Sequence, residues 1–441
     1  MEIKMTDEDK KEKLPSPKEI QSEIEALMRN KFGKNIQIIA QPFEFNDSIK
    51  HEHEEEIANE AIDNKEFDLN FNLTPKQVKE FLDQYVIKQD EAKKALAIAV
   101  CDHYNHVREC HLNKLSGITD SDDDNYSKQN VLMLGPTGVG KTYLVKTLAK
   151  LIGVPFVKAD ATKFTEMGYV GANVDDLVRD LVRIAKDNIE LAQYGIIYFD
   201  EADKIAGNKN LVGKDISGRG VQYALLKLME ETEIDLRGAH DVASQMQAFM
   251  DFQKTGKINP KTINTKHILF IVSGAFSGLE ELIKRRLKVR TIGLNTNEEK
   301  NILDEMNILD NAITKDFIDF GFEPEFIGRL PVRLSCVKLS AEDLYKVLKD
   351  SRGSIINQYV QSFKSFGLHV TFEDEALVRI AELAYLENTG ARALMTVCEK
   401  IFRSYKFELP GSKIQSFVVT KALVDHPEQE LQVILARSIH N

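Results

Sequence analysis

The chain contains little cysteine and no long hydrophobic run. Its four cysteines, Cys101, Cys110, Cys336 and Cys398, form no C-x-x-C pair and no other zinc-binding spacing. We therefore expect buried, reduced thiols and neither a disulfide framework nor a zinc site. The apolar run ILFIV, at residues 268–272, has the length of a strand and is far too short to cross a bilayer. The sequence therefore predicts no membrane partner.

An excess of basic charge is also missing. Residues 1–70 hold 18 acidic and 10 basic residues, a balance of −8, whereas the whole chain of 441 residues carries −11. The other 371 residues are therefore close to neutral, which argues against a nucleic-acid partner. The N-terminus, MEIKMTDEDKKEK, lacks the apolar stretch of a secretory signal, so we expect no signal peptide and a cytoplasmic protein.

The hydrophobic pattern predicts three parts. Residues 1–70 form a separate N-terminal module in which PKEIQSEIEALMRNKF has helical spacing, followed by the acidic stretch KHEHEEEIANEAIDNKE. From residue 71 to 335, apolar strands alternate with helical stretches, and Thr74 with Pro75 opens the first helix. Residues 336–441 are mainly helical in pattern. We therefore predict an α/β large domain with a parallel sheet and a smaller, mainly helical C-terminal domain.

The stretch VLMLGPTGVGKTYL carries the strongest functional signal. It contains G-x-x-x-x-G-K-T directly after an apolar strand and before a helix, the pattern of a P-loop NTPase. Glycines let backbone N–H groups surround phosphates, the lysine reaches the outer phosphates, and the threonine hydroxyl binds Mg²⁺. We therefore predict that ATP and Mg²⁺ are the cofactors. The predicted nucleotide-binding residues are Gly135, Pro136, Thr137, Gly138, Val139, Gly140, Lys141, Thr142 and Tyr143.

Two further strands end in polar residues. YGIIYFDEADKI ends its apolar part at Asp200 and Glu201, and HILFIVSGAF leads to Ser273. A carboxylate beside the phosphate loop can hold magnesium, the role predicted for Asp200 together with Thr142. Glu201 is the predicted general base for the attacking water. Ser273 is predicted to hydrogen-bond the γ-phosphate or that water. These residues together predict ATP hydrolysis.

With both nucleotide motifs in place, residues 74–440 resemble the AAA+ ATPases, and specifically their ClpX-type protein unfoldases. The resemblance rests on LDQYVIKQDEAKKALAIAV, GPTGVGKT, GYVGANVDD, IYFDEADKI, DISGRGVQYALLKLMEET, ILFIVSGAFSGLEELI, PEFIGRLPV and NTGARALMTVCE, which occur in the family's order. It implies that Val86 and Ile87 contact adenine. Lys88 stands where the family usually has glycine.

The resemblance also assigns two arginines. Arg329, in FIGRLPV, is expected to act as an arginine finger on the ATP of a neighbouring subunit, and Arg392, in TGARAL, to reach the nucleotide of its own subunit. An arginine supplied from a neighbour requires a head-to-tail interface, which closes into a ring. In this family the ring is a homo-hexamer. A structural salt bridge is the alternative for each arginine.

A ring also explains the apolar pair in EMGYVGANVDD. Tyr169 and Val170, between two glycines, are expected to project into the central channel and grip a protein substrate by apolar contact. A surface loop that touches a neighbouring subunit is the alternative. Ile292, Gly293 and Leu294 resemble the family's Ile-Gly-Phe tripeptide, which docks a ClpP-like peptidase. The expected activity is therefore ATP-dependent unfolding and threading of proteins into such a peptidase.

The sequence departs from the family at its N-terminus, which lacks the usual four-cysteine zinc domain. Adaptor and substrate choice are therefore expected to differ. Three other interpretations compete with the unfoldase. A remodelling chaperone without a peptidase would need no docking tripeptide. A nucleic-acid motor conflicts with the near-neutral body and with the GYVG loop, and a non-catalytic scaffold conflicts with the intact Lys141, Asp200 and Glu201.

Overall fold

The computed structural model describes residues 71–115, 127–165, 173–207, 216–236, 261–290 and 307–439. They lie within one compact unit, Lys65–Asn441. The predicted N-terminal module, the Tyr169–Val170 pair and the Ile292–Leu294 tripeptide lie outside the described residues. The domain boundaries given above remain predictions.

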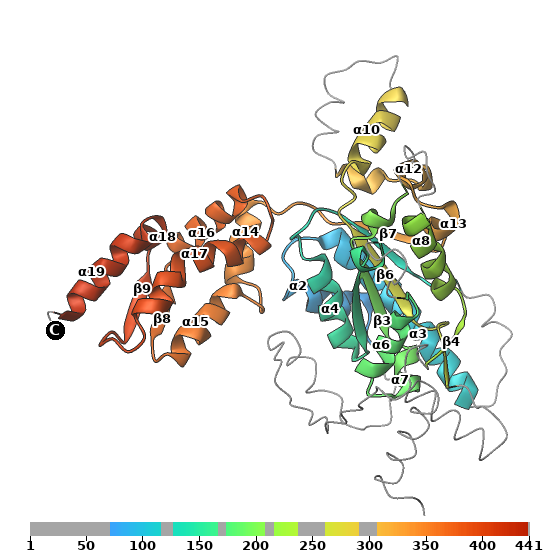
Figure 1. The fold of residues 1–441 in the computed structure, drawn as a ribbon, viewed down its shortest axis with the longest axis horizontal. Coiled ribbons are helices and arrows are strands. Elements are labelled where there is room, and N and C mark those ends of the chain that lie inside the picture. Colours follow the sequence, from blue (N-terminus) through green and yellow to red (C-terminus); the bar gives the residue numbers. More distant parts are fainter. Residues whose placement is uncertain are drawn as a thin grey trace, which may run out of the picture. The chain divides into compact units, whose positions relative to one another are not determined.

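The first part of the described chain alternates helices and strands (Figure 1). Its elements are α2 (Pro75–Asp83), α3 (Asp90–Leu115), β1 (Val131–Leu134), α4 (Lys141–Ile152), β2 (Phe156–Asp160), α5 (Thr162–Thr165), α6 (Asp176–Ile184), α7 (Ile189–Gln193), β3 (Ile196–Asp200), η2 (Ala202–Ile205), α8 (Ile216–Met229), β4 (Glu233–Asp235), β5 (Thr262–Asn264), β6 (Leu269–Gly274), α10 (Leu279–Arg290), η3 (Ile308–Asn311), α12 (Thr314–Phe320), α13 (Pro324–Gly328) and β7 (Val332–Ser335).

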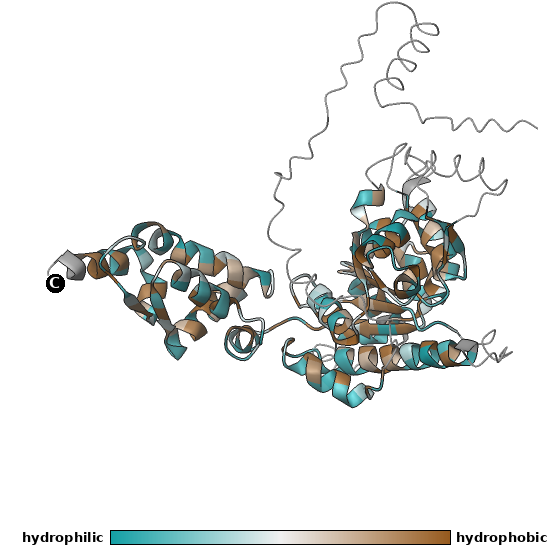
Figure 2. Cartoon of the chain, turned by 90° about the horizontal axis from the view of Figure 1, so that it is seen from below, coloured by the Kyte–Doolittle hydropathy of each residue, from teal (hydrophilic) through white to brown (hydrophobic). Residues whose placement is uncertain are grey.

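The central sheet has five parallel strands in the order β2-β3-β6-β1-β7. Strands β1, β3 and β6 are almost entirely buried, as expected for a parallel sheet covered by helices on its faces. Hydrophobic residues concentrate along the strands, whereas the surrounding helices carry both hydrophobic and hydrophilic residues (Figure 2). Because the strands are parallel, the carboxyl ends of β1, β3 and β6 lie at one edge of the sheet. The predicted α/β fold with a parallel sheet is confirmed.

The last part of the described chain is mainly helical, as predicted. Its elements are α14 (Ala341–Lys349), α15 (Ile355–Ser365), β8 (His369–Phe372), α16 (Asp374–Leu386), α17 (Arg392–Glu408), β9 (Ser416–Val419), α18 (Lys421–Asp425) and α19 (Pro427–Ile439). Strands β8 and β9 form a separate parallel pair. Phe363 packs edge-on against Phe402 and Phe417, with ring centroids 5.9 and 5.4 Å away. These aromatic contacts form the core that joins the helices to the strand pair.

The first helix begins where the sequence predicts it. Thr74 caps α2, and Gln77 returns a side-chain hydrogen bond to the Thr74 backbone, with Pro75 at the first helical position. This capping box satisfies N–H groups that a helix start otherwise leaves without partners.

Within the described residues, no helix combines the length and apolar character that a membrane span needs.

Candidate nucleotide-binding site

The glycine motif forms the turn between β1 and α4. Gly135, Gly138 and Gly140 all have positive φ angles, of 137°, 75° and 98°. Helix α4 starts at Lys141 with no side chain capping its N-terminus, so its first N–H groups are available to an anion. A loop of this shape at a helix N-terminus binds phosphate through backbone N–H groups and the helix dipole.

Lys141 lies inside this loop. Its side chain is buried, and Nζ donates hydrogen bonds to the carbonyl oxygens of Gly135, at 2.5 Å, and Pro136, at 2.9 Å. Burial lowers the pKa of the Lys141 ammonium, and the Asp200 carboxylate partly opposes this shift. The ammonium is therefore held within the loop, where phosphate oxygens can replace the two carbonyl groups as its partners.

Asp200, at the end of β3, points toward the same loop. Its Oδ2 accepts a hydrogen bond of 3.1 Å from the Thr142 hydroxyl. Its Oδ1 accepts bonds from the Ser273 hydroxyl, at 2.6 Å, and from the Glu201 N–H, at 3.0 Å. Burial alone raises the pKa of Asp200, but these donors and the Lys158 ammonium outweigh it and lower the pKa overall. Asp200 is therefore held in its charged form.

The structure brings nine of the predicted site residues around one cavity of about 550 Å³, a volume typical of small-molecule sites. Its lining includes Lys141, Thr142, Tyr143, Asp200, Glu201 and Arg392. The backbone of Glu201 adopts a left-handed conformation, with φ of 56°, which is uncommon for a residue with a Cβ and marks a constrained position. Ser273 is fully buried, and its hydroxyl is bonded to Asp200 rather than lining the cavity.

The loop before α17 packs against the glycine motif. The Ala391 N–H donates a 2.8 Å hydrogen bond to the Gly138 carbonyl. A Cβ on Gly138 would lie 2.0 Å from the Thr389 carbonyl oxygen, so this approach requires glycine. Arg392 follows directly as the first residue of α17. The helical part of the chain thus supplies an arginine to the cavity through a backbone contact with the phosphate loop.

Val86 and Ile87, the predicted adenine contacts, follow α2. Val86 is buried, and its Cγ1 lies 3.6 Å from the position of a Cβ on Gly140, so it packs beside the phosphate loop. Its carbonyl accepts a 2.9 Å hydrogen bond from the buried Lys93 ammonium. Ile87 is half-buried. Their contact with adenine remains a prediction.

Lys88 keeps the backbone conformation that a glycine would allow. Its φ is 61°, in the left-handed region, which costs energy for a residue with a Cβ. Its ammonium forms a 2.7 Å ion pair with Asp343 on α14. The neighbouring Gln89 side chain exchanges two 2.8 Å hydrogen bonds with the Val337 backbone. These contacts hold the segment in place without the glycine.

We predict that Asp83→Asn lowers the free energy of unfolding by about 2 kcal/mol, less than for a fully buried ion pair because the Asp83 side chain is 38% exposed. Lys93 is 3% exposed and donates hydrogen bonds to Asp83, at 2.5 Å, and to the Val86 carbonyl. Removing Asp83's charge leaves a buried cation without its counter-ion. Lys93→Met, which removes the buried charge itself, should cost less. Urea unfolding of both variants measures this, and equal losses would contradict the account.

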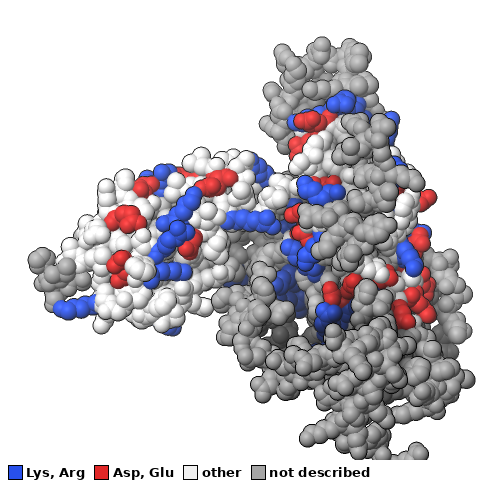
Figure 3. Space-filling model, in the orientation of Figure 1, with Lys and Arg blue, Asp and Glu red and all other residues white. Residues whose placement is uncertain are grey.

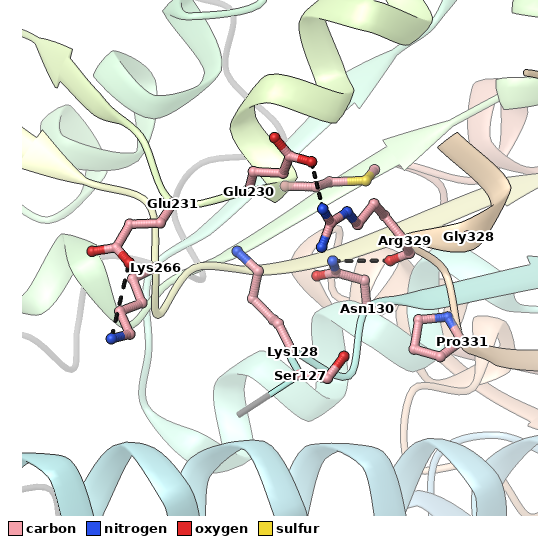
Figure 4. A pocket seen from close by; sticks show the side chains of 10 residues that line it. Ser127, Lys128, Asn130, Glu230, Glu231, Lys266, Gly328, Arg329 and Pro331 are labelled. Carbon is pink, nitrogen blue, oxygen red and sulfur yellow. Dashed lines mark hydrogen bonds and ion pairs between the residues drawn. The ribbon is translucent and has the colours of Figure 1, made fainter. Parts of the chain in front are cut away.

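Arg329 lies at a different cavity, of about 370 Å³ (Figure 4). Its guanidinium forms a 2.6 Å ion pair with Glu230, and its side chain is 54% exposed. Its backbone carbonyl accepts a 3.1 Å hydrogen bond from Asn130, a buried residue next to β1. The arginine thus has a fixed backbone and an accessible side chain, and it does not line the cavity that contains Lys141.

Sequence reasoning missed several residues at the site, two of which contact the Thr142–Asp200 pair. Tyr198 is buried in β3, and its hydroxyl lies 3.3 Å from the Thr142 hydroxyl and 2.6 Å from that of Ser273. The available signal was its position two residues before Asp200, because alternate residues of a strand share a face. Lys158, on β2, has its ammonium 3.6 Å from Asp200 Oδ2.

A phosphate loop, a carboxylate pair at the end of a nearby parallel strand and an adjoining helical part that supplies an arginine define an AAA+ ATPase. The family model described as AAA domain (Cdc48 subfamily) matches residues 126–333. The chain is 40% identical over 372 residues to the ATP-dependent Clp protease ATP-binding subunit ClpX of Borrelia duttonii, covering 83% of this chain and 82% of that protein. It is 38% identical over 370 residues to the protein of the same description from Bacteroides thetaiotaomicron, covering 82% and 84%.

The chain belongs to the ClpX family of AAA+ ATPases. The resemblance inferred from the motifs is confirmed, and the enzyme is an ATPase.

Proposed function

We propose that this chain is an ATP-driven protein unfoldase that threads its substrates into a ClpP-like peptidase. The observation that carries the proposal is the convergence of Lys141, Thr142, Asp200, Glu201 and Arg392 on one cavity. The relatives' description as the ATP-binding subunit of a Clp protease supports the peptidase partner. A cytoplasmic location follows from the same proposal.

ATP hydrolysis in this cavity assigns a task to each residue. The N–H groups of the loop and the Lys141 ammonium bind the phosphates of ATP. Thr142 and Asp200 offer hard oxygen donors 3.1 Å apart, a donor set that suits Mg²⁺, which neutralises phosphate charge when bound. Glu201, lining the cavity, takes the proton from the attacking water. Arg392 contacts the nucleotide from the helical part of the same subunit.

Arg329 serves the ATP of a neighbouring subunit in a homo-hexameric ring. It lines a separate cavity, and its exposed side chain leaves the guanidinium accessible to a second copy. An arginine supplied from a neighbour stabilises charge on the transferring phosphoryl group and ties hydrolysis to ring assembly. In the ring, Tyr169 and Val170 line the channel and grip the substrate, and Ile292, Gly293 and Leu294 contact the peptidase.

Nucleic acid is a less suitable substrate. On the face shown in Figure 3, acidic and basic side chains of the described residues lie interspersed. A nucleic-acid motor is typically marked by a basic stripe along its binding groove. On this face the charge distribution of the described residues therefore favours a protein substrate.

Affinity capture with Glu201→Gln tests the proposal. This variant should hold ATP without hydrolysing it, and so retain its substrate. Captured with ATP, it should be enriched in specific proteins and in a peptidase, compared with the wild-type chain in ADP. Protein enrichment without a peptidase would favour the remodelling chaperone. Enrichment of nucleic acid alone would contradict the proposal.

A further inference from the structure

Four side chains at the edge of the sheet form a ring of polar contacts within hydrogen-bonding distance. The Thr142 hydroxyl lies 3.1 Å from Asp200 Oδ2 and 3.3 Å from the Tyr198 hydroxyl. The Tyr198 hydroxyl lies 2.6 Å from Ser273 Oγ, which donates to Asp200 Oδ1 at 2.6 Å. Tyr198 and Ser273 are both fully buried. No part of the proposed ATPase chemistry yet uses the Tyr198 hydroxyl.

The hydrogen bonds in this ring have a defined direction. A hydroxyl donates one hydrogen, and a charged carboxylate only accepts. Ser273 donates to Asp200, so it accepts the hydrogen of Tyr198. The Tyr198 oxygen is then left with its lone pairs facing Thr142. The direction is therefore fixed from Tyr198 through Ser273 to Asp200, whereas the one Thr142 hydrogen has two acceptors within reach, Asp200 Oδ2 and the Tyr198 oxygen.

This direction matters because Thr142 and Asp200 are the proposed magnesium ligands. A hydroxyl that offers its lone pair to a cation must place its hydrogen on another acceptor. Asp200 Oδ2 is the nearer acceptor, but as a metal ligand it would give a lone pair to the cation. The Tyr198 oxygen can accept the Thr142 hydrogen instead, while Ser273 and the Glu201 N–H hold Oδ1 and leave Oδ2 for the metal.

We infer that Tyr198 is a positioning residue that, with Ser273, orients Thr142 and Asp200 as magnesium ligands, an inference that rests on the metal-binding roles given to these two residues in the proposed function. Groups hydrogen-bonded behind a metal's ligands tune its affinity in this way. The fold produces the arrangement from two strands. Tyr198 and Asp200 share one face of β3, and β3 pairs with β6, in the register Phe199 to Val272, which brings Ser273 to the level of Asp200.

Tyr198→Phe tests the inference, because it removes the hydroxyl group and keeps the aromatic ring of the side chain. The readout is binding of a fluorescent ADP to the full chain, titrated with Mg²⁺ and repeated in EDTA. We expect the Mg²⁺ concentration for half-maximal tightening to rise about tenfold or more, with binding in EDTA unchanged. Tyr104→Phe is the matched control. It removes a buried hydroxyl that donates to the Tyr194 carbonyl at 2.9 Å, so it should leave the Mg²⁺ dependence unchanged.

Ser273→Ala provides a second route to the same result, because it breaks the chain of donors one step later. It should shift the Mg²⁺ dependence as Tyr198→Phe does, and the double variant should add little to either change. An Mg²⁺ dependence unchanged in the folded variants, or shifted equally in Tyr104→Phe, would overturn the inference. A wild-type chain whose nucleotide binding does not depend on Mg²⁺ would instead contradict the metal-binding roles proposed for Thr142 and Asp200.

Discussion

Glu201→Gln should bind ATP with nearly wild-type affinity and hydrolyse it at least about 100-fold more slowly, the range lost with a general base. The backbone of Glu201 is fixed by its N–H bond to Asp200 and by its left-handed conformation. Glu201 lines the cavity, and exchanging its carboxylate for an amide of the same size leaves the site's shape intact. A steady-state ATPase assay and nucleotide titration together measure both parts of this expectation.

Two companion variants separate the roles of the carboxylate pair. Asp200→Asn removes the proposed metal ligand, so it should weaken Mg²⁺-dependent binding as well as hydrolysis. Glu201→Asp keeps the charge but shortens its reach, so it should retain more activity than Glu201→Gln. If Glu201→Gln lost nucleotide binding while Asp200→Asn kept it, the two residues would have exchanged roles.

Arg329→Ala should reduce ATP hydrolysis by at least about 100-fold, because arginine fingers contribute about 10³–10⁵ to the rate of phosphoryl transfer in related chemistry. ATP binding should change little, because the residue lines a different cavity from its own subunit's phosphate loop. The Asn130 bond to the backbone should keep the local structure. Arg379→Ala is the control, since that arginine pairs with Asp425 and Glu382.

Mixed rings distinguish a neighbour's arginine from one that acts within its own subunit. Lys141→Ala subunits lack a working phosphate loop but keep Arg329, and Arg329→Ala subunits have the reverse defect. Some interfaces in a mixed ring combine an intact loop with an intact finger, so the mixture should regain part of the activity that each variant lacks alone. An arginine acting within its own subunit predicts no regain at any mixing ratio.

The nucleotide site could be predicted from the sequence because its parts are local. The glycines, Lys141 and Thr142 are consecutive residues, and a strand followed by Asp200 and Glu201 is recognisable from apolar patterning alone. The parallel sheet followed from alternating strands and helices. The roles of Arg329 and Arg392, in contrast, came only from the family resemblance, because nothing in their local sequence indicates which cavity they reach.

What the sequence did not indicate depends on long-range packing. The contact between Tyr198 and Ser273 exists because β3 pairs with β6. The order of strands in a sheet cannot be predicted from the local sequence pattern. Lys88 stands where the family usually has glycine, and the sequence does not show how a residue with a Cβ is accommodated there. The structure keeps the left-handed conformation and adds an ion pair to Asp343, 255 residues away.

The most direct test of an ATP-driven unfoldase is the number of ATP molecules hydrolysed per folded protein unfolded. The substrate is a protein recovered in the Glu201→Gln capture. Its unfolding is measured by the loss of its native fluorescence. The free energy of unfolding of a native domain is about 5–15 kcal/mol. A channel that holds the polypeptide more weakly should therefore release it more often before the domain unfolds. The wild-type chain should unfold it at a finite ratio, Tyr169→Phe should be close to wild type, and Tyr169→Ala should need several-fold more ATP. ATP hydrolysis by the wild-type ring that never unfolds the substrate would contradict the account.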